Sequence, residues 1–120
     1  LFAAHGEPAF RRWEADAVRR ALVPGAVVAL GGGAVLDEHT RALLAHATVV
    51  LVTVDEQTAE RRISGGGRPL VADGIASWRR IAAERDPIYR ELADTVVDSS
   101  RTPMAQLVDR LEAWLAERGL

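Results

Sequence analysis

The stretch VVALGGGAVLDEHTRALL, residues 27–44, runs from an apolar segment through three glycines into a charged, amphipathic segment. Its apolar part, AVVAL at 26–30, has the length and composition of a buried strand. The segment at 37–46 has helical spacing, with Asp37 as a candidate N-cap. Glycine permits positive φ and lets backbone amides approach a ligand. We therefore expect Gly31–Gly33 at the carboxyl end of a strand, where open α/β sheets bind ligands.

The rest of the chain continues this alternation of strand-like and helical segments. The residue patterns predict helices at 8–22, 55–63, 75–85 and 102–119, and strands at 47–54 and 94–98. Asp86–Pro87 is expected to interrupt the chain before one more helical turn at 88–93, and Gly119 is expected to end the last helix. Strands that alternate with helices favour an α/β fold with a parallel sheet.

Composition indicates one soluble globular domain over residues 1–120, with 48% hydrophobic residues, 27% charged residues and a net charge of -2. The small net charge gives no reason to expect a nucleic acid or a membrane as partner. Because cysteine is absent, disulfides, thiolate metal sites and cysteine nucleophiles are excluded. The histidines, His5, His39 and His46, share no metal-ligand spacing, so a zinc enzyme has little support and no metal site is predicted.

Lysine is also absent, since all fifteen basic residues are arginine. These residues therefore contain no Walker A pattern, G-x-x-x-x-G-K-[ST], whose lysine contacts the β- and γ-phosphates. The glycines also lack the G-x-G-x-x-G spacing of a Rossmann dinucleotide site.

Some arginines stand where they could bind an anion. Arg11 precedes Glu14 by one helical turn, so the carboxylate could orient the guanidinium, although such a pair is often only a surface ion pair. Arg68 lies in SGGGRPLVADG, 64–74, which is either a mobile lid over an anionic ligand or a plain exposed loop. Arg85 precedes the expected helix break, where it could also pair only with a neighbouring acid.

In order and spacing, these segments resemble the shikimate kinase family. FAAHGEPAFRRWE at 2–14 is similar to the family's F-[AT]-x-x-G-E-x-x-F-R-x-x-E, and GGGAV, RPL, ERDPIY and a strand ending in VD follow in family order. The resemblance covers essentially the whole chain. It implies a P-loop kinase fold, a three-layer parallel sheet with helices on both faces. It also implies ATP-dependent phosphorylation of shikimate to 3-phosphoshikimate in the cytoplasm, a step of chorismate and aromatic amino acid biosynthesis.

The resemblance also implies roles for individual residues. Arg11, braced by Glu14, and Arg85 would hold the shikimate carboxylate, to which planar guanidinium groups are well suited. Gly32 would offer its N–H to a substrate hydroxyl, with Gly33 beside it. The pocket wall would be Phe2, Phe10, Pro69 and Leu70. Arg68 would close over the site as the catalytic residue and neutralise charge on the transferring phosphoryl group. Arg62 and Arg101 would flank the adenine of ATP, although the spacing at Arg101 differs from the family pattern by about one residue.

One part of the family pattern has no counterpart here. The family's P-loop and its Mg²⁺ ligands precede the segment at 2–14, so roughly 40 to 50 residues are expected upstream, in a longer kinase that is a monomer when full length. Without the central strand of that region, the predicted strands 26–30 and 47–54 would have unpaired edges, and the 120 residues alone would fold poorly and be inactive. A non-catalytic carboxylate-binding remnant and a related gluconate-type kinase remain open as alternatives.

Overall fold

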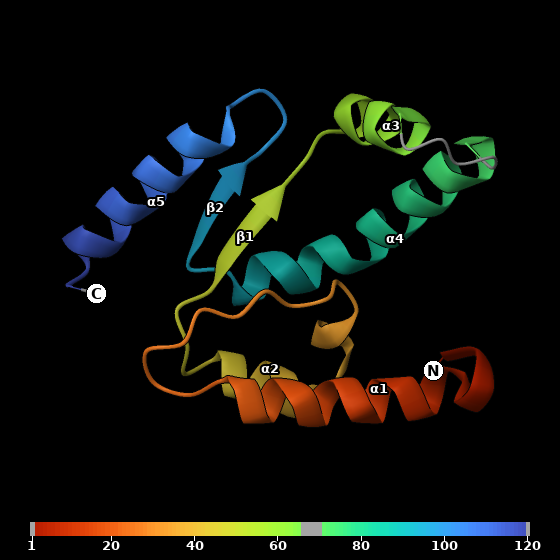
Figure 1. Cartoon of the computed structure of the whole chain (residues 1–120), viewed down its shortest axis with the longest axis horizontal. Coiled ribbons are helices and arrows are strands. Elements are labelled where there is room, and N and C mark those ends of the chain that lie inside the picture. Colours follow the sequence, from red (N-terminus) through yellow and green to blue (C-terminus); the bar gives the residue numbers. More distant parts are fainter. Residues whose placement is uncertain (1, 66–70, 120) are drawn as a thin grey trace. The chain divides into compact units, whose positions relative to one another are not determined.

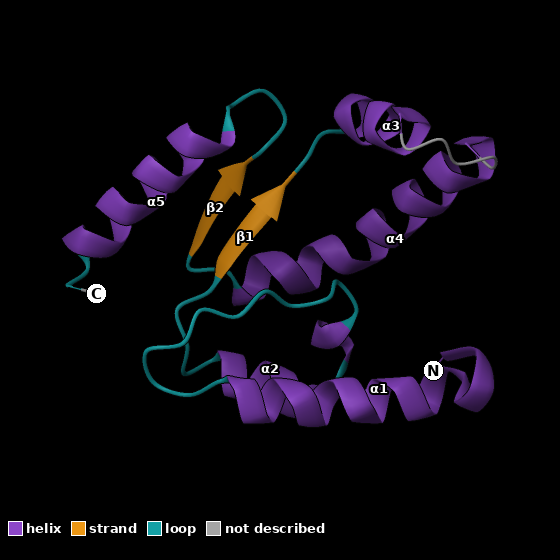
Figure 2. Cartoon of the chain, viewed as in Figure 1, coloured by secondary structure: helices purple, strands orange, loops and turns teal. Residues whose placement is uncertain are grey.

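The computed structural model describes residues 2–65 and 71–119, and places side chains for residues 6–62 and 74–119. Internal contacts divide the chain into two compact units, Leu1–Val49 and Val50–Leu120. Figures 1 and 2 show the helices and strands of both units. The single domain expected from composition stays a prediction.

The first unit is helical. It contains α1 (Phe2–Ala21), the short 3₁₀ helix η1 (Ala34–Leu36) and α2 (Glu38–Leu44). Gly6 interrupts α1 with non-helical angles, φ 78° and ψ 173°, so the regular part of α1 begins close to the predicted start at residue 8. Pro8 is tolerated because it lies in the first turn of this regular part, where a backbone N–H would have no helical partner. Among the residues of this unit whose side chains are described, those buried are Val18, Gly33, Ala34, Val35, Thr40 and Leu44.

Asp37 caps α2, as the sequence predicts. Its Oδ2 accepts hydrogen bonds from the backbone N–H of Thr40 at 2.9 Å and from the Thr40 hydroxyl at 3.2 Å. The Thr40 N–H, by favouring the charged carboxylate, lowers the pKa of Asp37 below its usual range. Arg41 Nη1 donates to the carbonyl of Val35 at 2.7 Å, which connects α2 to η1. The helix is therefore fixed at its start and along one side.

The predicted strand at 26–30 is wrong. The structure assigns no strand in this segment, and Val27 is fully exposed. A strand is stabilised by a hydrogen-bonded neighbour, and among the described residues the only paired strands lie elsewhere in the chain. The apolar composition of 26–30 is therefore not accompanied by pairing or burial.

The second unit contains a parallel pair of strands, β1 (Val50–Thr53) and β2 (Thr95–Asp98), shown as arrows in Figure 2. The register places Val50 opposite Thr95 and Thr53 opposite Asp98. Because both strands run in the same direction, their carboxyl ends meet at one edge of the sheet. The parallel pairing and the helices between the strands confirm the predicted α/β class.

Helices α3 (Glu56–Gly65) and α4 (Val71–Leu92) connect the two strands, and α5 (Met104–Glu117) follows β2. The predicted break at Asp86–Pro87 is wrong, because α4 continues through Pro87. Proline removes one backbone donor, yet the helix resumes, with the N–H of Ala93 donating to the Tyr89 carbonyl at 3.0 Å. Of the predicted loop at 64–74, residues 64–65 and 71–74 are helical, and 66–70 lie outside the described residues.

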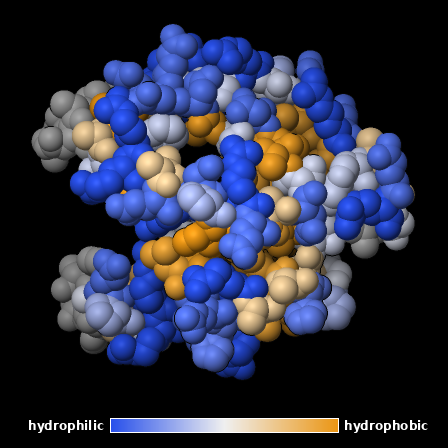
Figure 3. Space-filling view, turned by 180° about the vertical axis from the view of Figure 1, so that it is seen from behind, coloured by the Kyte–Doolittle hydropathy of each residue, from blue (hydrophilic) through white to orange (hydrophobic). Residues whose placement is uncertain are grey.

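The C-terminal helix ends close to where the sequence predicts. Gly119 has φ 77°, the left-handed conformation that commonly terminates helices. Leu107 is buried, and Leu107, Leu111 and Trp114 line a hollow beside β2. Apolar side chains are exposed on the face shown in Figure 3. On the strands, Val52 and Val96 are exposed. Among the helices described, none combines the length and the apolar character needed to cross a membrane.

Candidate functional site

The first part of the candidate site is an ion pair on α1. Arg11 Nη1 lies 2.5 Å from Glu14 Oε1, one helical turn away. The side chains are 28% and 15% exposed, so the pair is partly withdrawn from solvent. Partial burial distinguishes it from the exposed pair of Arg19 and Asp16 on the same helix. The orientation of Arg11 by Glu14, expected from their spacing, is present in the structure.

The glycine turn lies directly against this ion pair. A Cβ added at Gly33 would stand 2.6 Å from Arg11 Cζ, and nearer still to Nη1, a separation that real atoms do not show. A Cβ at Gly31 would stand 3.0 Å from Glu14 Oε2, a tight contact. The backbone of Gly33 has φ −88° and ψ −4°, which any residue can adopt. Close approach, and not positive φ, is therefore what requires glycine at position 33.

The surroundings of Arg11 hold the guanidinium on further sides. Arg11 Cζ lies 5.2 Å from the centre of the Phe10 ring, within the range of a cation–π interaction. Arg11 Nε is buried and has no hydrogen-bond partner among the side chains and backbone that the structure describes. The guanidinium, which stays partly exposed, is thus bordered by the Phe10 ring, the Glu14 carboxylate and the backbone of Gly33.

The second part of the candidate site lies at the carboxyl ends of β1 and β2. The backbone N–H and the hydroxyl of Ser99 both donate to the Thr53 carbonyl, at 2.8 and 2.9 Å. The N–H of Asp55 donates to Ser100 Oγ at 2.8 Å. These bonds extend the connection between the strands beyond the sheet itself. Sequence reasoning missed the two serines, although a polar run, DSSRT, directly after a strand was a usable signal.

Two carboxylates at this edge are stabilised in the charged form. Asp55 caps α3 by accepting from the Thr58 N–H at 2.7 Å, and this bond is the main cause of its lowered pKa. Asp98 accepts hydrogen bonds from the hydroxyl and N–H of Ser100 and from the Thr53 hydroxyl, and these lower the pKa of Asp98. Both side chains are therefore fixed acceptors at neutral pH.

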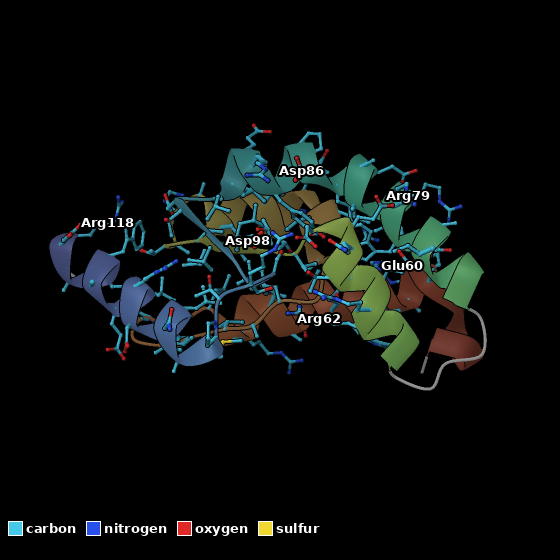
Figure 4. The ribbon with its side chains drawn as sticks, turned by 90° about the horizontal axis from the view of Figure 1, so that it is seen from above. Glu60, Arg62, Arg79, Asp86, Asp98 and Arg118 are labelled. Atoms are coloured by element: carbon cyan, nitrogen blue, oxygen red, sulfur yellow. The ribbon has the colours of Figure 1, made fainter. Side chains whose placement is uncertain are left out.

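Both arginines predicted near adenine reach this same edge. Arg62 donates from Nη2 to the Ser99 carbonyl at 3.0 Å, and Figure 4 labels it on α3 together with Asp98 on β2. Arg101 Nη1 lies 3.2 Å from Asp55 Oδ2, and its side chain is 76% exposed. The structure thus brings Arg62 and Arg101 to one cluster, from segments far apart in sequence.

Other predicted residues are placed less fully. Arg85 is half-buried on α4, with no hydrogen bond or ion pair to another described residue. Its neighbour Asp86 pairs with Arg90 instead. Gly32 is exposed in the glycine turn. The side chain of Phe2, and all of Arg68, Pro69 and Leu70, lie outside the described residues. Within the described residues, histidine, aspartate and glutamate side chains do not gather in threes as a metal site would need.

Comparison with known proteins decides the family. Residues 1–116 match the family model described as shikimate kinase. The chain belongs to the shikimate kinase family. This membership confirms the resemblance, and the parallel strand pair is consistent with the P-loop kinase fold of the family. Arg11, Glu14, Arg62, Arg85 and Arg101 all fall within the matched residues.

Individual relatives agree with the family match. A shikimate kinase of Nitrobacter winogradskyi is 42% identical over 98% of this chain and 57% of its own length. One from Corynebacterium jeikeium is 45% identical over 93% of this chain and 62% of its own length. One from Francisella philomiragia is 36% identical over 98% of this chain and 70% of its own length. The chain therefore spans between 57% and 70% of the length of these shikimate kinases.

Proposed function

We propose that the protein containing this chain phosphorylates shikimate with ATP to give 3-phosphoshikimate, a step of chorismate and aromatic amino acid biosynthesis. The observation that carries the proposal is the guanidinium of Arg11, held 2.5 Å from Glu14 and against the glycine turn. A planar guanidinium of fixed orientation is the group best suited to a carboxylate. Family membership supports the same substrate, since the similar proteins are named shikimate kinases.

On the substrate side, Arg11 binds the carboxylate and Glu14 orients it, with Arg85 as a second cation. Asp86, the acidic neighbour of Arg85, pairs with Arg90, and among the described residues no other carboxylate pairs with Arg85, which supports this role. The Gly32 N–H donates a hydrogen bond to the oxygen of a substrate hydroxyl, beside Gly33. The apolar wall consists of Phe2, Phe10, Pro69 and Leu70, of which Phe10 lies next to the Arg11 guanidinium.

On the nucleotide side, Arg62 and Arg101 flank the adenine. Their position at the carboxyl ends of parallel strands supports this, because ligands of α/β sheets bind at that edge. Arg68 is the catalytic arginine that neutralises charge on the phosphoryl group during transfer. Among the described residues, no three acidic or histidine side chains gather as ligands for the Mg²⁺ that accompanies the nucleotide. We place the Mg²⁺ ligands in the part of the relatives that this chain does not span.

Purified protein from the natural gene is the material for the test, with ADP release measured as a function of shikimate and of gluconate. We expect turnover with shikimate and none with gluconate. Arg11→Lys keeps the charge but loses the planar fork, so the KM for shikimate should rise about tenfold or more while the KM for ATP changes little. Absence of shikimate-dependent ADP release from the natural protein would refute the proposed function.

The isolated 120 residues provide a second comparison. We propose that they do not transfer phosphate, and that the natural protein is a cytoplasmic monomer. ADP release by the isolated chain, at a rate near that of the natural protein, would disprove the first statement. Sedimentation of the natural protein tests whether it is a monomer.

A further inference from the structure

The glycine turn has a feature that substrate binding alone does not explain. The guanidinium of Arg11 occupies the space that a side chain at position 33 would need, since its Cζ would stand 2.6 Å from an added Cβ. The backbone angles of Gly33, φ −88° and ψ −4°, place no demand for glycine. Gly33 is also buried, and the guanidinium occupies the position that its Cβ would take.

We propose that Gly33 is a positioning residue for Arg11: the absence of its Cβ creates the seat that fixes the plane of the guanidinium. This inference rests on the proposed function, in which Arg11 binds the substrate carboxylate. Glu14 alone does not fix that plane, because a single hydrogen bond from Nη1 allows the guanidinium to turn about the axis of that bond. The backbone of Gly33 supplies the second constraint, and the Phe10 ring supplies a third.

The chemistry of the obstruction makes the inference testable. The atoms that an added Cβ would meet belong to the end of a flexible side chain, and not to backbone. Gly33→Ala should therefore displace Arg11 and leave the turn folded. Gly31 offers a matched control, because its added Cβ would meet only Glu14 Oε2, at 3.0 Å, and a small carboxylate shift relieves that contact.

A double-mutant cycle on the natural protein tests the coupling, with the Kd for shikimate measured by calorimetry. Gly33→Ala should raise the Kd about tenfold or more, since it misplaces a charged hydrogen-bond donor. In an Arg11→Ala background the same substitution should change the Kd by less than about twofold. Gly31→Ala should have a smaller effect than Gly33→Ala. Unchanged affinity in Gly33→Ala, or equal losses in both backgrounds, would overturn the inference, because Gly33 would then act independently of Arg11.

A second measurement separates this inference from the proposed function. The NMR signal of the Arg11 Nε–H group, assigned by its loss in Arg11→Lys, reports the surroundings of the guanidinium without any substrate. We expect Gly33→Ala to move this signal toward the position of exposed arginines, and Gly31→Ala to move it less. If the natural protein fails to bind shikimate but the signal moves as expected, the proposed function fails and the seat stands. A signal that stays in place refutes the seat.

Discussion

The backbone N–H of Asp55 donates a hydrogen bond of 2.8 Å to the hydroxyl of Ser100. Asp55 follows β1 and Ser100 follows β2, so this bond joins the carboxyl ends of two parallel strands that lie 45 residues apart in sequence. The same aspartate caps α3 through the Thr58 N–H. One residue therefore fixes a strand end, a helix start and a loop at the edge proposed to bind the nucleotide.

Replacing Ser100 with alanine tests this connection. The Asp55 N–H would lose its acceptor, and we expect the free energy of unfolding to fall by about 1 kcal/mol. Urea unfolding of the natural protein measures the change, and Ser100→Thr, which keeps a hydroxyl, is the control. Equal unfolding midpoints for Ser100→Ala and wild type would show that the bond contributes nothing.

The cap of α2 gives a second stability prediction. Asp37→Ala removes the acceptor of the Thr40 N–H and should cost about 1 kcal/mol of stability. Asp37→Asn keeps an acceptor oxygen and should lose less. Thermal unfolding compares the variants at neutral pH. A larger loss in the asparagine variant would indicate that charge, and not capping, is what stabilises the helix start.

The carboxylate of Asp98 predicts a pH dependence. Hydrogen bonds from Ser100 and Thr53 lower its pKa in the folded protein below the unfolded value of about 3.9. Between the folded and the unfolded pKa, the unfolded state binds more protons than the folded state. The contribution of Asp98 to the free energy of unfolding is therefore complete above about pH 5 and is lost as pH falls through the folded pKa. Asp98→Asn should flatten this acid dependence of the urea midpoint. Asp109→Asn, at an exposed position on α5, is the control. Its urea midpoint should depend on pH more steeply than the midpoint of Asp98→Asn. Identical acid profiles for wild type and Asp98→Asn would contradict the prediction.

Arg62 tests the nucleotide side. Arg62→Ala removes a cation and the bond to Ser99, so the KM for ATP should rise about tenfold, with little change in the KM for shikimate. Arg80→Ala is the matched control, because Arg80 is exposed on α4 and has no recorded partner among the described residues. An equal change in both variants would indicate a general charge effect and not a contact with ATP.

Local pattern accounts for much of the fold. The cap at Asp37, the end of α5 at Gly119 and the strands at 50–53 and 95–98 follow from residue types that act within a few positions. The pattern failed at 26–30, because apolar composition predicts a strand but does not supply its hydrogen-bonding neighbour. It failed at Pro87 because the loss of one donor did not end the helix.

The sequence alone determined the family, through the order of the motifs along the chain. It also predicted the pairing of Arg11 with Glu14, through their spacing of one helical turn. Only the tertiary structure shows why position 33 has no room for a side chain. Gly33 is bare because the guanidinium from a helix 22 residues earlier occupies the space of its side chain. Arg62 and Arg101 meet at one strand edge because parallel pairing brings together the ends of β1 and β2. Contacts between residues distant in sequence depend on packing, which no local pattern of residues encodes.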